Sequence, residues 1–194
     1  MAIAKQLTPK TTLLFHKADR LELSLCQYMN RMGHNRQVRL FFKAVSRLGD
    51  GVFWYTLGGL LPLMYGMEGL AALLHMAVAG FVCLGIYSQL KNRLVRQRPF
   101  ISFDAIQAHT APLDLYSFPS GHTMNAVNFT VLFCFFFPAF AWLVVPFAVL
   151  VALSRVILGM HYPTDVLVGA SLGMLLSYSS LIIWPAGMFA FLLG

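Results

Sequence analysis

Residues 122–153 read HTMNAVNFTVLFCFFFPAFAWLVVPFAVLVAL and contain no lysine, arginine, aspartate or glutamate. A bilayer crossing by an α-helix takes roughly 20 mostly apolar residues, so this run is too long for a single span. Pro138 lies near its middle, where a proline ring interrupts helical hydrogen bonding. We therefore expect two membrane-spanning helices, joined by a tight turn at Pro138.

Three further apolar runs complete the expected bundle: residues 51–67, 69–90 and 164–193, the last with a break near Pro185. The sequence thus predicts an all-α fold, a polytopic bundle of five transmembrane helices, with a sixth if the N-terminal region also crosses. The composition agrees, because 58% of the 194 residues are hydrophobic and 11% are charged. Charged residues make up roughly 25% of an ordinary soluble domain.

The N-terminal region differs from the rest of the chain. Residues 13–30 and 35–48 place apolar side chains at helical spacing but are interrupted by charges. This pattern is typical of basic amphipathic helices that lie in the membrane interface. The alternative, helices packed on a soluble core, has little core to pack on. We therefore divide the chain into interfacial helices at 1–50 and a transmembrane domain at 51–194.

Two sequence features bear on packing. Gly169 and Gly173 have the GxxxG spacing of closely packed helices, and we expect packing within the bundle rather than a dimer seam. The three cysteines lie far apart in amphipathic or apolar stretches, which favours buried thiols over a disulfide or a zinc site. They are Cys26, Cys83 and Cys134.

The polar residues gather at one end of the expected bundle. Threading five spans alternately through a membrane places residues 91–121 and 155–164 at the same face. Ionisable side chains at membrane depth are costly and usually functional. Three short segments at this face carry most of them.

The first segment is KNRLVRQRPF, residues 91–100. Lys91 and Arg98 are seven residues apart, so a helix would place both on one face. Pro99 then disfavours helix at Arg98 and turns the chain away. A phosphate site and a cluster touching anionic lipid headgroups both remain open for this pair. For Arg93 and Arg96 we expect contact with lipid headgroups.

The second segment is PSGH, residues 119–122. Ser120 is placed to cap a helix, with Gly121 and His122 in its first turn. The start of a helix offers unpaired backbone N–H groups that suit a phosphate, and a histidine there can exchange a proton near neutral pH. The alternative is an ordinary cap followed by a surface histidine.

The third segment is SRVILGMHYPTD, residues 154–165. Arg155 ends one span and Pro163 begins the next helix. Asp165 then lies close enough to accept a hydrogen bond from one nitrogen of His161, which leaves the other nitrogen free as a nucleophile. The alternative is a histidine–aspartate pair that merely closes a loop.

Together the segments supply the residue types that phosphoryl transfer requires. The reaction needs cations on the equatorial oxygens, an in-line nucleophile and an acid for the leaving group. The sequence has neither a cluster of carboxylates nor a Walker motif. We therefore expect no metal and no other cofactor.

These three segments closely resemble the signature of the type 2 phosphatidic acid phosphatase (PAP2) superfamily, over residues 91–165. The stretch SRLGDG, residues 46–51, is similar to the segment before a span in many bacterial members. The resemblance implies that His161 forms a phosphohistidine, that Asp165 orients it and that His122 protonates the leaving group. It also implies a set of phosphate-binding residues: Lys91, Arg98, Ser120, Gly121 and Arg155.

The leading hypothesis is a metal-independent membrane phosphatase that hydrolyses a phosphomonoester or diphosphate on a lipid headgroup. Undecaprenyl diphosphate, phosphatidylglycerophosphate, phosphatidic acid and lipid A phosphates all remain open as substrates. The alternatives are a lipid phosphotransferase that uses the same phosphohistidine and a non-catalytic lipid-binding membrane protein. The expected partners are the phosphorylated lipid and membrane lipids, with no nucleic acid and no obligate protein partner evident.

We expect a multi-pass protein of the cell (inner) membrane, but two arguments about its sidedness disagree. With five spans, all 14 lysines and arginines fall on the active-site side. The positive-inside rule would make that side cytoplasmic. The resemblance instead favours the outer, periplasmic face, because many similar bacterial proteins act there.

Overall fold

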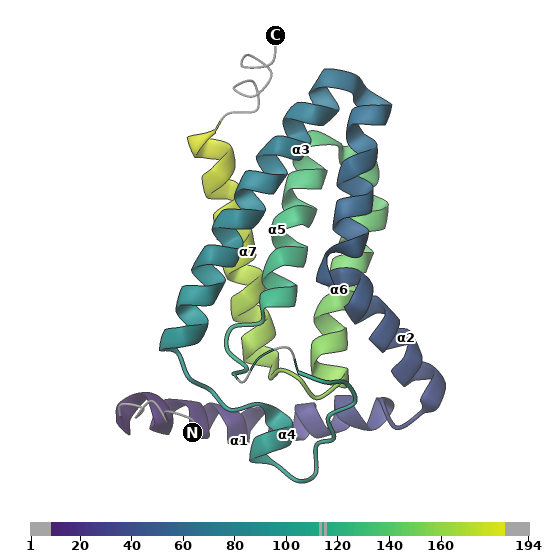
Figure 1. Cartoon of the computed structure of the whole chain (residues 1–194). Helices are drawn as coiled ribbons and strands as arrows, with labels where there is room; N and C mark the ends of the chain where they lie inside the picture. Colours follow the sequence, from purple (N-terminus) through teal and green to yellow (C-terminus); the bar gives the residue numbers. More distant parts are fainter. Residues whose placement is uncertain (1–8, 113, 115, 185–194) are drawn as a thin grey trace.

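The structure is a computed structural model that describes residues 9–112, 114 and 116–184 (Figure 1). The described part of the chain is helical and contains no β-strand, as the sequence predicts. Its α-helices are α1 (Pro9–Met32), α2 (Arg36–Arg47), α3 (Phe53–Arg93), α4 (Pro99–Ser102), α5 (Gly121–Phe136), α6 (Ala141–Ile157) and α7 (Pro163–Ile183). A π-helical turn, η1 (Leu48–Val52), joins α2 to α3, and a 3-10 turn, η2 (Pro138–Phe140), precedes α6.

Helix α3 consists of two limbs that run in opposite directions (Figure 1). They meet at Gly66, whose φ of 55° and ψ of −129° lie outside helical values and suit only a glycine. The two limbs lie close together beside this bend. A Cβ atom on Gly69 would lie 2.1 Å from the carbonyl oxygen of Leu61, so a glycine is needed there. The two limbs correspond to the spans predicted at 51–67 and 69–90.

The remaining spans also follow the sequence. Residues 122–153 form α5 and α6, which are separated at Pro138 as expected. Helix α7 ends at Ile183, two residues before the predicted break at Pro185. Residues 185–193 of the predicted last span lie outside the described residues.

Three helical runs among the described residues are long and apolar enough to cross a membrane: Arg36–Arg93, Pro138–Ile157 and Pro163–Ile183. The first run includes α2, η1 and both limbs of α3, and α5 has 16 residues. The polytopic all-α bundle is therefore confirmed. The choice between five and six crossings stays a prediction.

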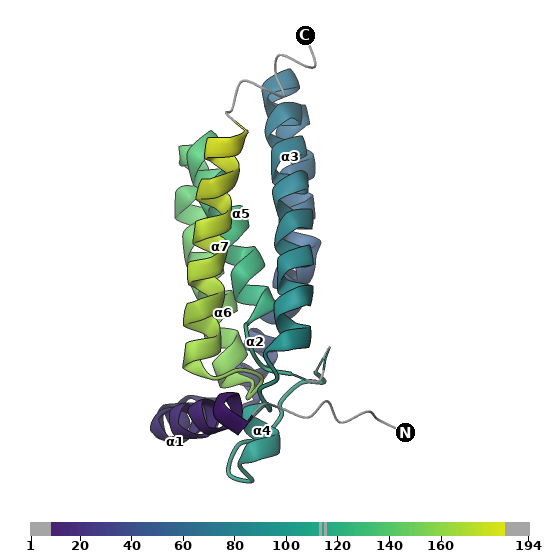
Figure 2. The ribbon, with the colours of Figure 1, turned by 90° about the vertical axis from the view of Figure 1, so that its left-hand side faces the viewer.

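The N-terminal region forms the two expected helices, but they differ in position. Helix α1 lies across one end of the bundle, whereas α2 continues through η1 into the first limb of α3 (Figures 1 and 2). Helix α1 exposes apolar side chains at helical spacing, namely Leu21, Leu25, Tyr28 and Met32. Their location in a membrane interface, and the division of the chain at residue 50, stay predictions.

Helix α7 packs directly on the backbone of α5. A Cβ atom on Gly173 would lie 2.3 Å from the carbonyl oxygen of Met124, and one on Gly169 would lie 2.6 Å from that of Ser120. The GxxxG pair therefore packs within the bundle, as predicted. The cysteines are free thiols, with Cys26 and Cys83 buried and Cys134 half-buried.

This contact gives a stability prediction. Gly173→Ala places its methyl group against backbone atoms of α5 that cannot move aside, so it should lower the free energy of unfolding by about 2–3 kcal/mol. Gly59→Ala is the matched control, because a Cβ atom there meets nothing within 4 Å. The control should leave stability unchanged or raise it slightly. Thermal unfolding in detergent measures the stability of both variants. Equal stability of Gly173→Ala and Gly59→Ala would contradict the close contact at Gly173.

Candidate active site

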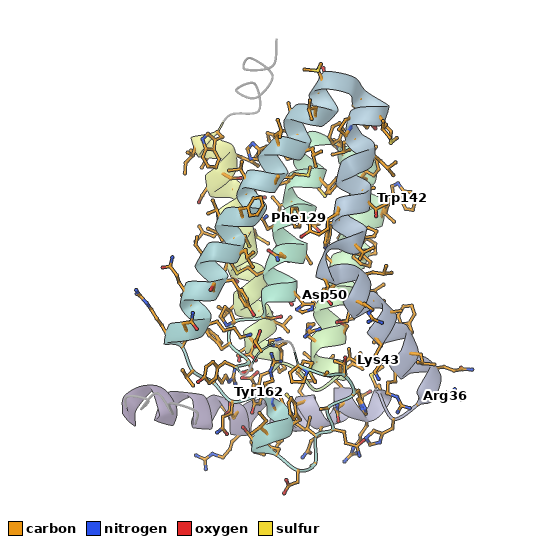
Figure 3. All side chains as sticks on the ribbon, in the orientation of Figure 1. Arg36, Lys43, Asp50, Phe129, Trp142 and Tyr162 are labelled. Atoms are coloured by element: carbon orange, nitrogen blue, oxygen red, sulfur yellow. The ribbon has the colours of Figure 1, made fainter. Side chains whose placement is uncertain are left out.

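The predicted site residues lie at the end of the bundle that α1 crosses (Figure 1). Each stands where a helix begins or ends, and Asp50 and Tyr162 mark this end of the bundle in Figure 3. Lys91 is in the last turn of α3, Arg98 precedes α4, and Ser120, Gly121 and His122 open α5. Arg155 is in the last turn of α6, His161 lies between α6 and α7, and Asp165 is in the first turn of α7.

Lys91 and Arg98 meet at one carboxylate, that of Asp114. Oδ1 of Asp114 lies 2.8 Å from Nζ of Lys91 and 2.7 Å from Nη2 of Arg98. The Tyr87 hydroxyl donates to Oδ2 of Asp114 at 2.7 Å. Burial raises the pKa of Asp114, but the hydrogen bonds from Lys91 and Tyr87 and the nearby charges outweigh it, so the pKa falls to about 2.

Lys91 and Arg98 come together through a turn of the chain before Pro99, where that proline disfavours helix. Helix α3 ends at Arg93, so the two cations do not share one helix face. Arg98 has extended backbone dihedrals and precedes Pro99, the first residue of α4. Its guanidinium is fixed by a hydrogen bond from Nη1 to the carbonyl oxygen of Met160 at 2.8 Å. The turn of the chain, rather than helical periodicity, brings the cations together.

His161 is buried among positive charges. Its side chain is 2% exposed. Burial first, and then the charges of Arg155, Arg98 and Lys91, hold its pKa well below the ordinary value. The imidazole is therefore neutral at pH 7 and keeps an unprotonated nitrogen, which a nucleophile requires.

Asp165 lies beside His161, as predicted. Its Oδ2 is 3.6 Å from Nδ1 of His161, which is longer than an ordinary hydrogen bond. The same oxygen accepts a hydrogen bond from the backbone N–H of Tyr162 at 2.8 Å. Catalytic hydrogen bonds are often long in ligand-free structures and shorten when substrate binds.

His122 contacts a carboxylate that sequence reasoning did not single out. Its Nε2 pairs with Oδ1 of Asp50, which lies in η1. Gly51 has a φ of 136°, so a glycine is needed directly after Asp50. The sequence signal for this contact is SRLGDG at 46–51, whose position before a span does not by itself indicate a role for Asp50.

The start of α5 departs in one detail from the expected cap. Ser120 occupies the N-cap position, but its hydroxyl lies 3.0 Å from that of Thr123 and does not bond a backbone N–H. Gly121 is required, because a Cβ atom there would lie 2.6 Å from the ring of Tyr87. Arg155 donates from Nη1 to the hydroxyl of Ser46 at 2.5 Å.

The structure contradicts the predicted role of Arg96. We expected it to touch lipid headgroups, but it is buried and pairs with Asp19 and Asp165. Arg93 is exposed, and its contact with lipid stays a prediction.

Two adjoining cavities extend from this site along the gap between the limbs of α3. The polar one, of about 260 Å³, is lined by Asp50, Asp114 and His122. The apolar one, of about 290 Å³, is lined by side chains of α3 and α5 that include Phe129 (Figure 3). The two share several lining residues, namely Trp54, Tyr55, Leu84, Asn125 and Phe129. Exposed Tyr55 and Phe81 stand at the rim, so the apolar cavity opens sideways.

The described residues contain no cluster of three or more histidine, cysteine, aspartate or glutamate side chains that could hold a metal ion. Metal independence stays a prediction. What the site offers is an anion-binding centre of buried cations next to a neutral histidine.

Fold and site together define a membrane-type helical bundle with an anion-binding centre at one end. The chain belongs to the PAP2 superfamily, because residues 68–188 match the profile of that family. The crystal structure of Aquifex aeolicus LpxE has the same fold, with a TM-score of 0.69 and 23% sequence identity. The match covers 94% of this chain and 99% of that one.

Two relatives are similar in sequence. Phosphatidylglycerophosphatase B of Bacillus subtilis is 36% identical over 155 residues, which cover 68% of this chain and 61% of the relative. Lipid A 1-phosphatase of Rhizobium johnstonii is 31% identical over 102 residues, which cover 49% of this chain and 41% of the relative. The chain thus spans less than two thirds of the length of either protein.

The contacts of Asp114 give a prediction. Asp114→Asn removes the negative charge that pairs with Lys91 and Arg98. If these two cations bind phosphate, inorganic phosphate should inhibit the variant about 5–10-fold more strongly. Because the pKa of Asp114 is about 2, the wild-type carboxylate is ionised at pH 7, where the two proteins are compared. Asp104→Asn, an exposed acid of the same connection, is the control. Weaker inhibition in Asp114→Asn would show that the carboxylate supports phosphate binding instead.

Proposed function

We propose that this protein is a membrane lipid phosphatase that works through a phosphohistidine. The observation that carries the proposal is the position of His161, buried and neutral beside Lys91, Arg98 and Arg155 at the end of an apolar bundle. Membership of the PAP2 superfamily and the names of the relatives, which are lipid phosphatases, support it.

Substrate binding replaces a contact within the protein. The phosphate takes the position of the Asp114 carboxylate, so that Lys91 and Arg98 exchange one anion for another. Arg155, the hydroxyl of Ser120 and the backbone N–H of Gly121 complete the binding site, since a helix start favours negative charge.

The chemistry then needs two histidines on opposite sides of phosphorus. Nδ1 of His161 faces Asp165, so Nε2 is the nitrogen that attacks. The P–N bond forms as the P–O bond to the lipid breaks, and His122 gives its proton to the departing oxygen. Water next attacks the phosphohistidine, releases inorganic phosphate and restores His161, while His122 takes back a proton from that water.

The apolar cavity supports a lipid rather than a soluble phosphate ester. It adjoins the polar cavity that His122 lines, and it continues along α5 to Phe133. A tail lying there would remain among apolar side chains while its headgroup reaches the cations at the bundle end. The neighbouring rim residues are exposed on the face that would meet the membrane.

The direct test is phosphate release in detergent from undecaprenyl diphosphate, phosphatidylglycerophosphate, phosphatidic acid and lipid A phosphate. The wild-type protein should release phosphate from at least one of them. His161→Ala should lose at least about 1,000-fold in kcat with its thermal unfolding little changed, because the nucleophile is absent. Near-normal turnover by His161→Ala would refute the mechanism. Transfer of phosphate to an added lipid acceptor, without release, would favour the phosphotransferase.

A second test concerns metal. Incubation with excess EDTA should change the rate of phosphate release by less than about twofold, because protein cations supply the positive charge. The control is the same dialysed sample without chelator. A large loss that added Mg²⁺ or Zn²⁺ restores would contradict a metal-independent reaction.

A further inference from the structure

Arg96 binds two acids of α1 with one side of its guanidinium. It donates to Oδ1 of Asp19 from Nε at 2.8 Å and from Nη2 at 2.6 Å, and Nη2 also lies 3.2 Å from Oε1 of Glu22. The guanidinium lies over the ring of Tyr162, 3.9 Å from the ring centroid. These contacts hold the side chain in one orientation within a buried setting.

The other side of the same guanidinium reaches the active site. Nη1 of Arg96 donates to Oδ1 of Asp165 at 2.6 Å. The second carboxylate oxygen, Oδ2, accepts from the backbone N–H of Tyr162 and faces His161. Each oxygen of Asp165 therefore has its own donor, and Arg96 fixes which oxygen is directed at His161.

Helix α1 also contacts the start of α7 directly. Oε2 of Glu22 accepts the backbone N–H of Thr164 at 2.8 Å, and Oε1 accepts the Thr164 hydroxyl at 2.7 Å. That hydroxyl is in turn an acceptor for Arg96 at 2.7 Å. Glu22 thus holds the turn from which Asp165 projects.

An ordinary buried ion cluster would contribute only to folding. This cluster differs because its cation is shared between α1 and the carboxylate next to the nucleophile. A planar guanidinium holds both in a fixed relative orientation, whereas a lysine ammonium is a compact point charge that fixes no such orientation.

We propose that Arg96 is a positioning residue for Asp165, and that Asp19 and Glu22 keep it in place. Helix α1 is then part of the catalytic apparatus and not a membrane-surface segment alone. The proposal rests on the proposed function, because it takes His161 as the nucleophile that Asp165 orients.

The first experiment compares Arg96→Lys with Arg93→Lys, an exposed arginine at the end of α3. Arg96→Lys keeps the positive charge but loses the planar guanidinium with its fixed N–H donors. The kcat should therefore fall about tenfold or more while KM changes less than about twofold. Arg93→Lys should match the wild type in both. Unchanged kcat in Arg96→Lys would overturn the proposal.

A double-mutant cycle separates positioning from folding. In an Asp165→Asn background, Arg96→Lys should lower kcat by less than about twofold, because the carboxylate through which it acts is gone. A structural role would cost the same factor in both backgrounds, and that additivity would overturn the proposal. The thermal unfolding of all four proteins is measured alongside.

The role of α1 is tested with Asp19→Asn and Glu22→Gln, and Glu68→Gln at the far end of the bundle is the matched control. The two α1 variants should lower kcat at unchanged KM, and the control should not. If Asp19→Asn does not fold, the kcat of Glu22→Gln is the test of α1. A wild-type kcat in Glu22→Gln would show that α1 has no part in positioning Arg96. A wild-type protein that hydrolyses lipids while His161→Ala is inactive upholds the phosphatase whatever Arg96→Lys shows.

Discussion

The site depends on the absence of side chains where α7 meets α5. Because Gly169 lies against the carbonyl group of Ser120, the first turns of the two helices approach closely enough for a backbone bond between them. The N–H of Ser120 donates to the carbonyl oxygen of Asp165 at 3.0 Å. This contact brings the segment with His122 next to the segment with His161, although dozens of residues separate them along the chain.

Positive charge concentrated at one end of an apolar bundle must be compensated, and the chain does so with carboxylates from several elements. Asp114 pairs with Lys91 and Arg98, while acids of α1 pair with Arg96. An isolated buried charge would be far too costly to keep. In the proposed mechanism the compensation also has a chemical use, because phosphate replaces the Asp114 carboxylate on cations that are already in place.

The sequence predicted the bundle well because its signals are local. The apolar runs and Pro138 each act on the chain around them, and the structure follows them. Three motif segments likewise predicted which residues gather at the site. The partners of those residues were not predictable in the same way. Arg96 looked like a lipid-facing cation because Asp19, its partner, lies 77 residues away. Asp114 stands in a connection without periodicity, and only the folded chain brings it to Lys91.

The sideways opening between the limbs of α3 determines how a lipid would meet this protein. A substrate that enters past Tyr55 and Phe81 arrives by diffusion in two dimensions, within a single leaflet. Its encounter rate is then set by its mole fraction among the surrounding lipids rather than by its amount per volume of solution. Dilution with inert lipid or detergent would slow turnover even at constant total substrate.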